Sequence, residues 1–201
     1  MNQPRRFRGQ LLNACIGALV FTLLGSLWAV FGVWSLGFKA EPLVAILLVL
    51  PFVALLISSV NAFRKVLRLP PDALSSEMLE RIARVKRGFG IVNAAQGIAI
   101  GLVFMLGFRL GHPEYIPPVV AFIVGLHFIA LAPILRMRFD YVIGLILCLL
   151  ALVTMLMVPL YTNAEISQHR TFLWGLVIGV GSAVALWLGA VSRLRGVYVA
   201  L

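Results

Sequence analysis

Charged residues are scarce in this sequence, at 12% of 201 residues, whereas about a quarter of an average soluble domain is charged. Hydrophobic residues make up 62% of the chain, so too few charges remain to cover the surface of a water-soluble fold. No stretch is long or polar enough to form a separate soluble domain. We therefore interpret residues 1–201 as one membrane domain.

Cysteines are few and the common catalytic patterns are absent. The two cysteines, Cys15 and Cys148, lie within apolar runs, which favours buried thiols. Neither has the spacing to other ligand residues that a metal site requires. The chain contains no H-E-x-x-H, no G-x-S-x-G and no phosphate-binding loop. No pair of carboxylates lies within an apolar run. These absences favour a role other than catalysis. We expect no catalytic residues, no bound metal and no cofactor.

Long apolar runs, by contrast, recur along the whole chain. A helix needs about 20 apolar residues to cross a hydrocarbon core of about 30 Å. The runs predict transmembrane helices at about 11–36, 43–63, 89–108, 117–135, 141–160 and 171–192. The first run is too long for the apolar part of a signal peptide. The expected fold is all-α, a bundle of six transmembrane helices.

Basic residues are distributed unevenly between the connections. Lys39, Arg109 and Arg170 lie in the connections after the first, third and fifth runs, and all other Lys and Arg lie at the other ends of the runs. Because cytoplasmic segments are enriched in Lys and Arg, we expect both termini in the cytoplasm, beside the anionic inner leaflet. This placement explains the formal charge of +10 without a nucleic-acid partner.

The connection at residues 64–88 is the longest. Pro70 and Pro71 are expected to end the second helix. An apolar stripe at helical spacing follows, formed by Leu74, Met78, Ile82, Val85 and Phe89. We expect an amphipathic cytoplasmic helix between the second and third transmembrane helices. It either lies on the membrane surface or lengthens the third helix, and the basic segment 72–87 could also dock a partner.

Small residues allow transmembrane helices to approach closely, and they recur on one face of three runs. They are Ala14, Ala18, Gly25 and Gly32 in the first run, Gly90, Gly97 and Gly101 in the third, and Gly175, Gly179, Ser182 and Gly189 in the sixth. We predict that these three helices form the tight centre of the bundle. The second, fourth and fifth helices are expected to kink at Pro51, Pro133 and Pro159.

His127 is the main candidate for a functional residue, because an ionisable side chain near the membrane midplane is costly. Amides on other runs could line a ligand site with it: Gln96 and Asn93 on the third, Asn13 on the first and Asn61 on the second. Gln96 and His127 are expected at nearly equal depth. The alternative is a neutral imidazole held by one amide, since such amides commonly join helices.

Two further polar groups have ordinary explanations. The outer connections contain His112, Glu114, Glu165 and His169, which could hold zinc if the connections met, or could simply be solvated. The carboxylate of Asp140 is expected to pair with Arg136 or Arg138, its neighbours in the sequence.

The segments Val124–Ala132 (VGLHFIALA) and Phe139–Gly144 (FDYVIG) resemble a G-L-H-F segment of small uncharacterised bacterial multi-pass membrane proteins, over about residues 89–160. The resemblance implies a bacterial inner-membrane protein and implies no activity. In size and helix number the chain is also similar to the substrate-binding membrane subunits of energy-coupling-factor vitamin importers. Those subunits dock a partner through small residues of the first helix, here Ala14 and Ala18.

Three functions therefore remain open. The first is binding or transport of a small solute through the cluster around His127. The alternative is a structural or regulatory membrane subunit that docks a protein partner, either a different membrane protein or a second copy of the chain. The third is a membrane enzyme with a metal site in the outer connections.

Overall fold

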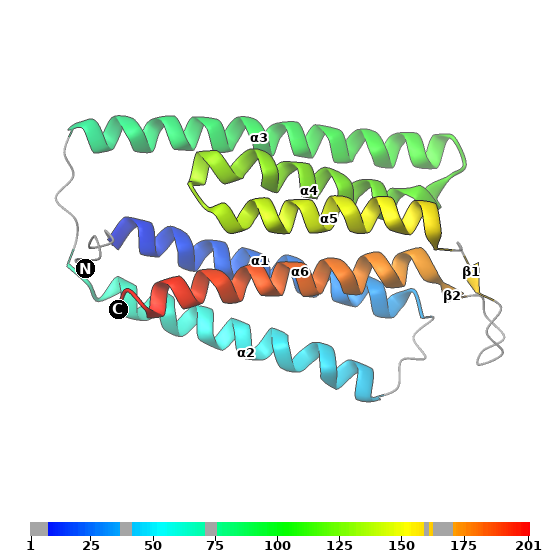
Figure 1. The fold of residues 1–201 in the computed structure, drawn as a ribbon, viewed down its shortest axis with the longest axis horizontal. Helices are drawn as coiled ribbons and strands as arrows, with labels where there is room; N and C mark the ends of the chain where they lie inside the picture. Colours follow the sequence, from blue (N-terminus) through cyan, green and yellow to red (C-terminus); the bar gives the residue numbers. More distant parts are fainter. Residues whose placement is uncertain (1–7, 37–41, 71–75, 159–160, 163–170) are drawn as a thin grey trace.

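The computed structural model describes residues 8–36, 42–70, 76–158, 161–162 and 171–201. Within these ranges the chain forms six long helices, one short 3₁₀ helix and two short strands (Figure 1). They are α1 (Arg8–Trp34), α2 (Pro42–Leu67), α3 (Ser76–Arg109), η1 (Pro113–Tyr115), α4 (Ile116–Leu135), α5 (Arg138–Met157), β1 (Tyr161–Thr162), β2 (Thr171–Phe172) and α6 (Leu173–Tyr198). The strands pair antiparallel, Tyr161 opposite Phe172.

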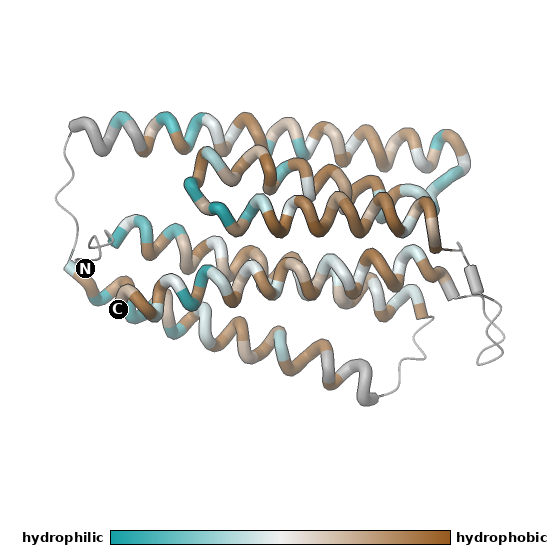
Figure 2. The backbone as a smooth tube through the Cα atoms, viewed as in Figure 1, coloured by the Kyte–Doolittle hydropathy of each residue, from teal (hydrophilic) through white to brown (hydrophobic). Residues whose placement is uncertain are grey.

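All six long helices are long and apolar enough to cross a membrane. Figure 2 shows apolar residues along the middle of the bundle and polar residues toward its two ends. Each helix overlaps one of the six predicted runs, so the predicted fold class is confirmed. The protein is a multi-pass α-helical membrane protein.

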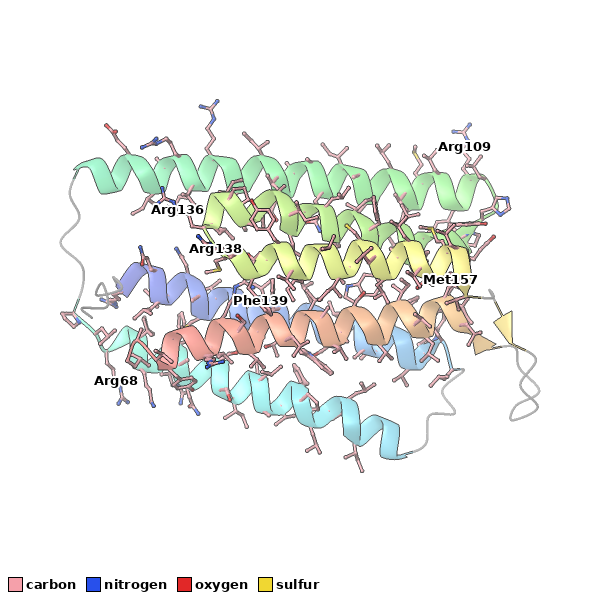
Figure 3. All side chains as sticks on the ribbon, in the orientation of Figure 1. Arg68, Arg109, Arg136, Arg138, Phe139 and Met157 are labelled. Atoms are coloured by element: carbon pink, nitrogen blue, oxygen red, sulfur yellow. The ribbon has the colours of Figure 1, made fainter. Side chains whose placement is uncertain are left out.

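Arginines mark the two ends of the bundle. Arg68, Arg136 and Arg138 lie at the end where α1 begins and α6 ends, and Arg109 lies at the opposite end (Figure 3). We refer to the first as the basic end. There Arg8, the first residue of α1, donates a hydrogen bond of 3.2 Å to the carbonyl of Leu67, the last residue of α2.

The helices form two groups. α1, α2 and α6 pack together, α3, α4 and α5 form the second group, and the groups meet mainly where α5 packs against α6. Figure 1 shows α2 and α3 at opposite edges of the bundle, with α1, α4, α5 and α6 between them.

The closest pair of helices is α1 with α6. A Cβ atom on Gly179 would lie 2.5 Å from Cα of Gly32, and one on Gly25 would lie 2.7 Å from Cδ1 of Trp187. Only hydrogen fits at these positions, so the two backbones approach closely along this seam. The prediction that small residues join the first and sixth helices is confirmed.

α4 and α5 form a tight hairpin that the sequence reasoning missed. A Cβ on Gly144 would lie 2.5 Å from the carbonyl oxygen of Gly125, and a Cβ on Gly125 would lie 2.7 Å from the carbonyl oxygen of Gly144. Only Arg136 and Met137 connect the two helices. Arg136 ends α4 in the left-handed conformation, with φ of 55°, and its backbone N–H bonds to the carbonyl of Ala132.

The prediction for the third helix was wrong. α3 packs mainly against α4 and η1, and a Cβ on Gly90, Gly97 or Gly101 would meet no atom within 4 Å in the part of the chain that the structure describes. The glycine spacing identified a face of the helix correctly but did not identify a neighbour for it. We call this surface, formed by Gly90, Gly97 and Gly101, the α3 glycine face.

The amphipathic helix expected in the 64–88 connection is the first part of α3, which runs unbroken from Ser76 to Arg109. The second of the two alternatives, a lengthened third helix, is therefore the one observed. Its apolar residues Ile82 and Phe89 are exposed. Leu74 lies outside the described residues.

α2 continues through Pro51 and α4 through Pro133, and Pro159 lies outside the described residues, so the kinks at these prolines stay predictions.

The alanine pair of the first helix has a role inside the bundle. Ala14 and Ala18 are buried against α2 and α6, in a core cluster that includes Ala62 and Leu194. The pair is thus used inside the bundle and is not available to dock a partner in the way the importer resemblance implied.

Candidate functional site

His127 lies on α4, where this helix packs against α3. Its imidazole is half-buried and faces the backbone of Val92 on α3. Its Nδ1 is buried and has no hydrogen-bond partner among the described residues. The ring therefore lies between two helices with this nitrogen unused.

The amides on α3 do not complete this interaction. Asn93 donates a hydrogen bond of 2.7 Å to the carbonyl of Phe89, one turn earlier in its own helix. Gln96 is half-buried, and its side chain makes no hydrogen bond within the described ranges, so the expected bond to His127 is not formed. The imidazole meets α3 at Val92, one turn nearer the basic end than Gln96.

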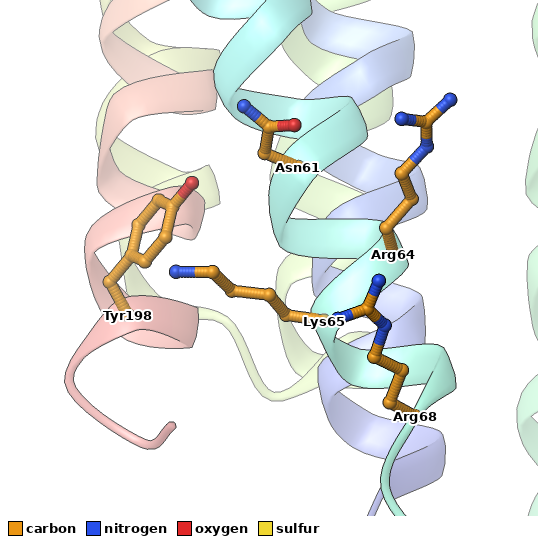
Figure 4. Close-up of a pocket in the computed structure, with 5 residues that line it drawn as sticks. All are labelled: Asn61, Arg64, Lys65, Arg68 and Tyr198. Atoms are coloured by element: carbon orange, nitrogen blue, oxygen red, sulfur yellow. The ribbon is translucent and has the colours of Figure 1, made fainter.

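The amides on the first two helices lie elsewhere. Asn13 is exposed on α1, and Asn61 is exposed on α2, where it lines a hollow with Arg64, Lys65 and other residues (Figure 4). Both helices belong to the group that does not contain α3 and α4. The five residues expected to line one site are therefore divided between at least two places.

A different polar group occupies the bundle interior. Nη2 of Arg193 on α6 lies 2.8 Å from both carboxylate oxygens of Asp140 on α5. The two side chains are 8% and 2% exposed. The guanidinium carbon also lies 3.8 Å from the ring centroid of Phe21 on α1, a cation–π contact. This cluster links three helices and joins the two helix groups by an ion pair.

Gly17 on α1 leaves space for the side chain of Arg193. A Cβ at Gly17 would lie 2.8 Å from Nε of Arg193, so a larger residue would displace the guanidinium. Nε and Nη1 of Arg193 have no hydrogen-bond partner among the described residues. Phe21 and Asp140 thus stabilise the positive charge of Arg193, but two of its hydrogen-bond donors stay without a partner among the described residues.

The expected pairing of Asp140 was wrong. Arg136 and Arg138 are exposed at the basic end, and the partner of Asp140 is Arg193. One signal in the sequence could have found it: Arg193 follows Gly189 by four residues and so continues the small-residue stripe of the sixth helix. An arginine on the stripe that packs inward requires a buried acid nearby.

Two of the polar residues expected to hold zinc at the opposite end form a local pair. Nδ1 of His112 lies 2.9 Å from Oε1 of Glu114, two residues away. Glu165 and His169, the other residues of the expected zinc cluster, lie outside the described residues. Within those residues no three His, Cys, Asp or Glu side chains gather to hold a metal ion.

The described residues thus offer two interior polar features, the imidazole between α4 and α3 and the ion pair between α5 and α6. Neither places a nucleophile beside a base among the described residues. Comparison of the chain with protein-family models, with curated proteins and with solved structures gives no match.

Proposed function

We propose that this protein is a structural or regulatory membrane subunit that docks a partner protein along α3. The observation that carries the proposal is the α3 glycine face, where an added Cβ would meet no described atom within 4 Å. Glycine is unfavourable within a helix, by about 1 kcal/mol relative to alanine. In transmembrane helices it is found where a neighbouring helix approaches closely. A helix of the partner would occupy the place beside this face that none of the six described helices fills.

The charge of α3 narrows the choice of partner. The basic end of α3 presents Arg84, Lys86 and Arg87 to solvent, and none of them has an ion-pair partner among the described residues. A second copy packed in parallel would bring these cations together. The partner we propose is therefore a different membrane protein with small residues on one helix and acidic residues beyond it at the basic end.

We further propose that the protein resides in a bacterial inner membrane with its basic end in the cytoplasm. The excess of Lys and Arg at that end supports the orientation. The resemblance of the Val124–Ala132 segment to bacterial multi-pass proteins supports the location. The acidic segment of the partner would then be cytoplasmic.

Site-specific photocross-linking in native membranes tests the docking proposal. A photoreactive residue at Ala94, between Gly90 and Gly97 on α3, is expected to form an adduct with one protein. The adduct should disappear with Gly97→Leu, which fills the face, and weaken with Arg84→Gln, Lys86→Gln and Arg87→Gln combined. A photoreactive residue at Leu149, an exposed position on α5, serves as the control and should not form it.

Two outcomes would contradict the proposal. Adducts with lipid alone would mean that the α3 glycine face is simply a lipid-facing surface. An adduct with a second copy of the chain would replace the different partner by a homo-oligomer.

The unused nitrogen of His127 favours a second candidate, binding or transport of a small solute. A ligand that binds only the folded protein at 100 times its Kd stabilises it by about 2.7 kcal/mol. Thermal unfolding against a panel of metabolites and metal ions, with wild type and His127→Leu, tests this function. A compound that raises the midpoint of the wild type alone supports it, and a panel without effect rejects it for those compounds.

A further inference from the structure

The basic end contains a hollow of about 310 Å³ between α2 and α6, shown in Figure 4. It is lined by Asn61, Arg64, Lys65, Arg68 and Tyr198. Asn61, Arg64 and Lys65 share one face of α2, and Arg68, directly after the helix, continues the same spacing. Tyr198 is the last residue of α6. Two helices of the same group therefore build this hollow.

Three positive charges in the hollow lack an acidic partner. Arg64, Lys65 and Arg68 form no ion pair with any described residue. Nζ of Lys65 lies 5.4 Å from the ring centroid of Tyr198, and the hydroxyl of Tyr198 donates a hydrogen bond of 3.1 Å to the carbonyl of Ser58. The ring is thus held to α2 and positions the ammonium group. An anion with several acceptor oxygens would relieve the repulsion among the three cations.

Exposed apolar rows lead from the hollow toward the middle of the bundle. On α2 the row comprises Ile46, Leu50, Val53 and Ile57, and on α6 it comprises Val184, Leu188 and Val191. The α2 row continues at helical spacing into Asn61, Arg64 and Arg68, so the apolar and basic residues share one face. The α6 row continues in the same way into Tyr198. Figure 1 shows α2 diverging from α6 away from the basic end.

We propose that this hollow binds the phosphate group of an anionic phospholipid, whose acyl chains lie along the apolar rows of α2 and α6. A phosphate diester supplies the charge and the acceptor oxygens, and the two rows supply surfaces for the chains. A free phosphate ion would use the hollow but not the rows. The inference rests on neither of the proposed functions, because the hollow lies on the helix group opposite α3 and His127.

Native mass spectrometry of the intact protein in detergent tests the site. Short-chain phosphatidylglycerol is titrated against short-chain phosphatidylcholine, with glycerol phosphate and inorganic phosphate as separate arms. One molecule of phosphatidylglycerol is expected per chain, with at least about tenfold weaker binding of phosphatidylcholine. Each basic residue near an anionic lipid contributes about 1 kcal/mol, so Arg64→Gln, Lys65→Gln and Arg68→Gln combined should weaken binding by about 100-fold.

A matched control removes the same number of charges elsewhere at the basic end. The combination of Arg84→Gln, Lys86→Gln and Arg87→Gln on α3 also removes two arginines and one lysine, and it should leave binding unchanged. If both combinations weakened phosphatidylglycerol binding equally, the lipid would be held by general charge attraction and the proposal would be overturned. Binding of glycerol phosphate or inorganic phosphate as tightly as phosphatidylglycerol would assign the hollow to a soluble anion and would also overturn it.

The single variant Lys65→Gln keeps the test decisive if the triple variant does not fold. It should lower the affinity for phosphatidylglycerol by about fivefold and leave the thermal midpoint of the lipid-free protein within a few degrees of wild type. An unchanged affinity in this variant would contradict the role given to the hollow.

Discussion

Replacing Asp140 by leucine would remove the carboxylate that pairs with Arg193 and leave a guanidinium 8% exposed among apolar side chains. Two unit charges about 4 Å apart attract by about 4 kcal/mol at an effective dielectric constant of about 20. Removing one partner of a buried pair costs about 3–5 kcal/mol, because the other charge stays buried without compensation. We therefore expect Asp140→Leu to lower the free energy of unfolding by about this amount.

The double variant gives the sharper test. Asp140→Leu combined with Arg193→Met replaces both charges by apolar side chains, a change that is commonly neutral in protein interiors. It should retain most of the wild-type stability, so that the losses in the two single variants are not additive. The coupling energy should be at least about 2 kcal/mol.

SDS-induced unfolding in mixed micelles, followed by tryptophan fluorescence, measures these differences. Arg138→Met is the control, because Arg138 lies beside Asp140 in the sequence but is exposed, and it should change stability by less than about 0.5 kcal/mol. Losses that add in the double variant would refute the reasoning. A loss in Arg138→Met as large as in Arg193→Met would do so as well.

The remaining predictions concern single positions. Gly179→Ala should destabilise the protein by about 1–3 kcal/mol, because the added Cβ would lie 2.5 Å from the α1 backbone. Gly97→Ala should be neutral or stabilising in the absence of a partner. The same SDS titration compares the two variants. Arg136→Gly should raise the thermal midpoint, because glycine relieves a left-handed conformation that costs other residues about 1 kcal/mol. Trp174→Phe should cost about 1 kcal/mol in SDS unfolding, since it removes the indole N–H that donates to the Val158 carbonyl at 2.8 Å.

The six helices were predictable because a chain in lipid must satisfy its backbone hydrogen bonds internally, which requires long apolar helices. Glycine spacing likewise identified the faces of the first and sixth helices that pack together. The same spacing misled for the third helix, because a pattern within one helix carries no information about which other helix lies against it. The seam between Gly125 and Gly144 was missed because each helix contributes a single glycine there.

The interior polar residues were harder to place. Nearness in the sequence suggested that Asp140 pairs with Arg138, yet its partner is Arg193, 53 residues away. Counting depth along two helices placed His127 beside Gln96, whereas it faces the backbone of Val92. An error of one helical turn in depth is enough to exchange one partner for another. Predicting contacts of this kind requires the rotation and height of each helix, which hydropathy does not determine.

The seam between α1 and α6 has a consequence for synthesis. Gly32 is made well over a hundred residues before Gly179, the residue against which it packs. At translation rates of about 5–20 residues per second, α1 waits roughly 10–30 s in the membrane for its closest neighbour. During that interval its glycine-lined face is open to any other helix in the bilayer. Quality-control proteases and insertion chaperones would therefore meet this protein first with α1 not yet covered by α6, and a ribosome that stalls before α6 would leave a chain that cannot close its own core.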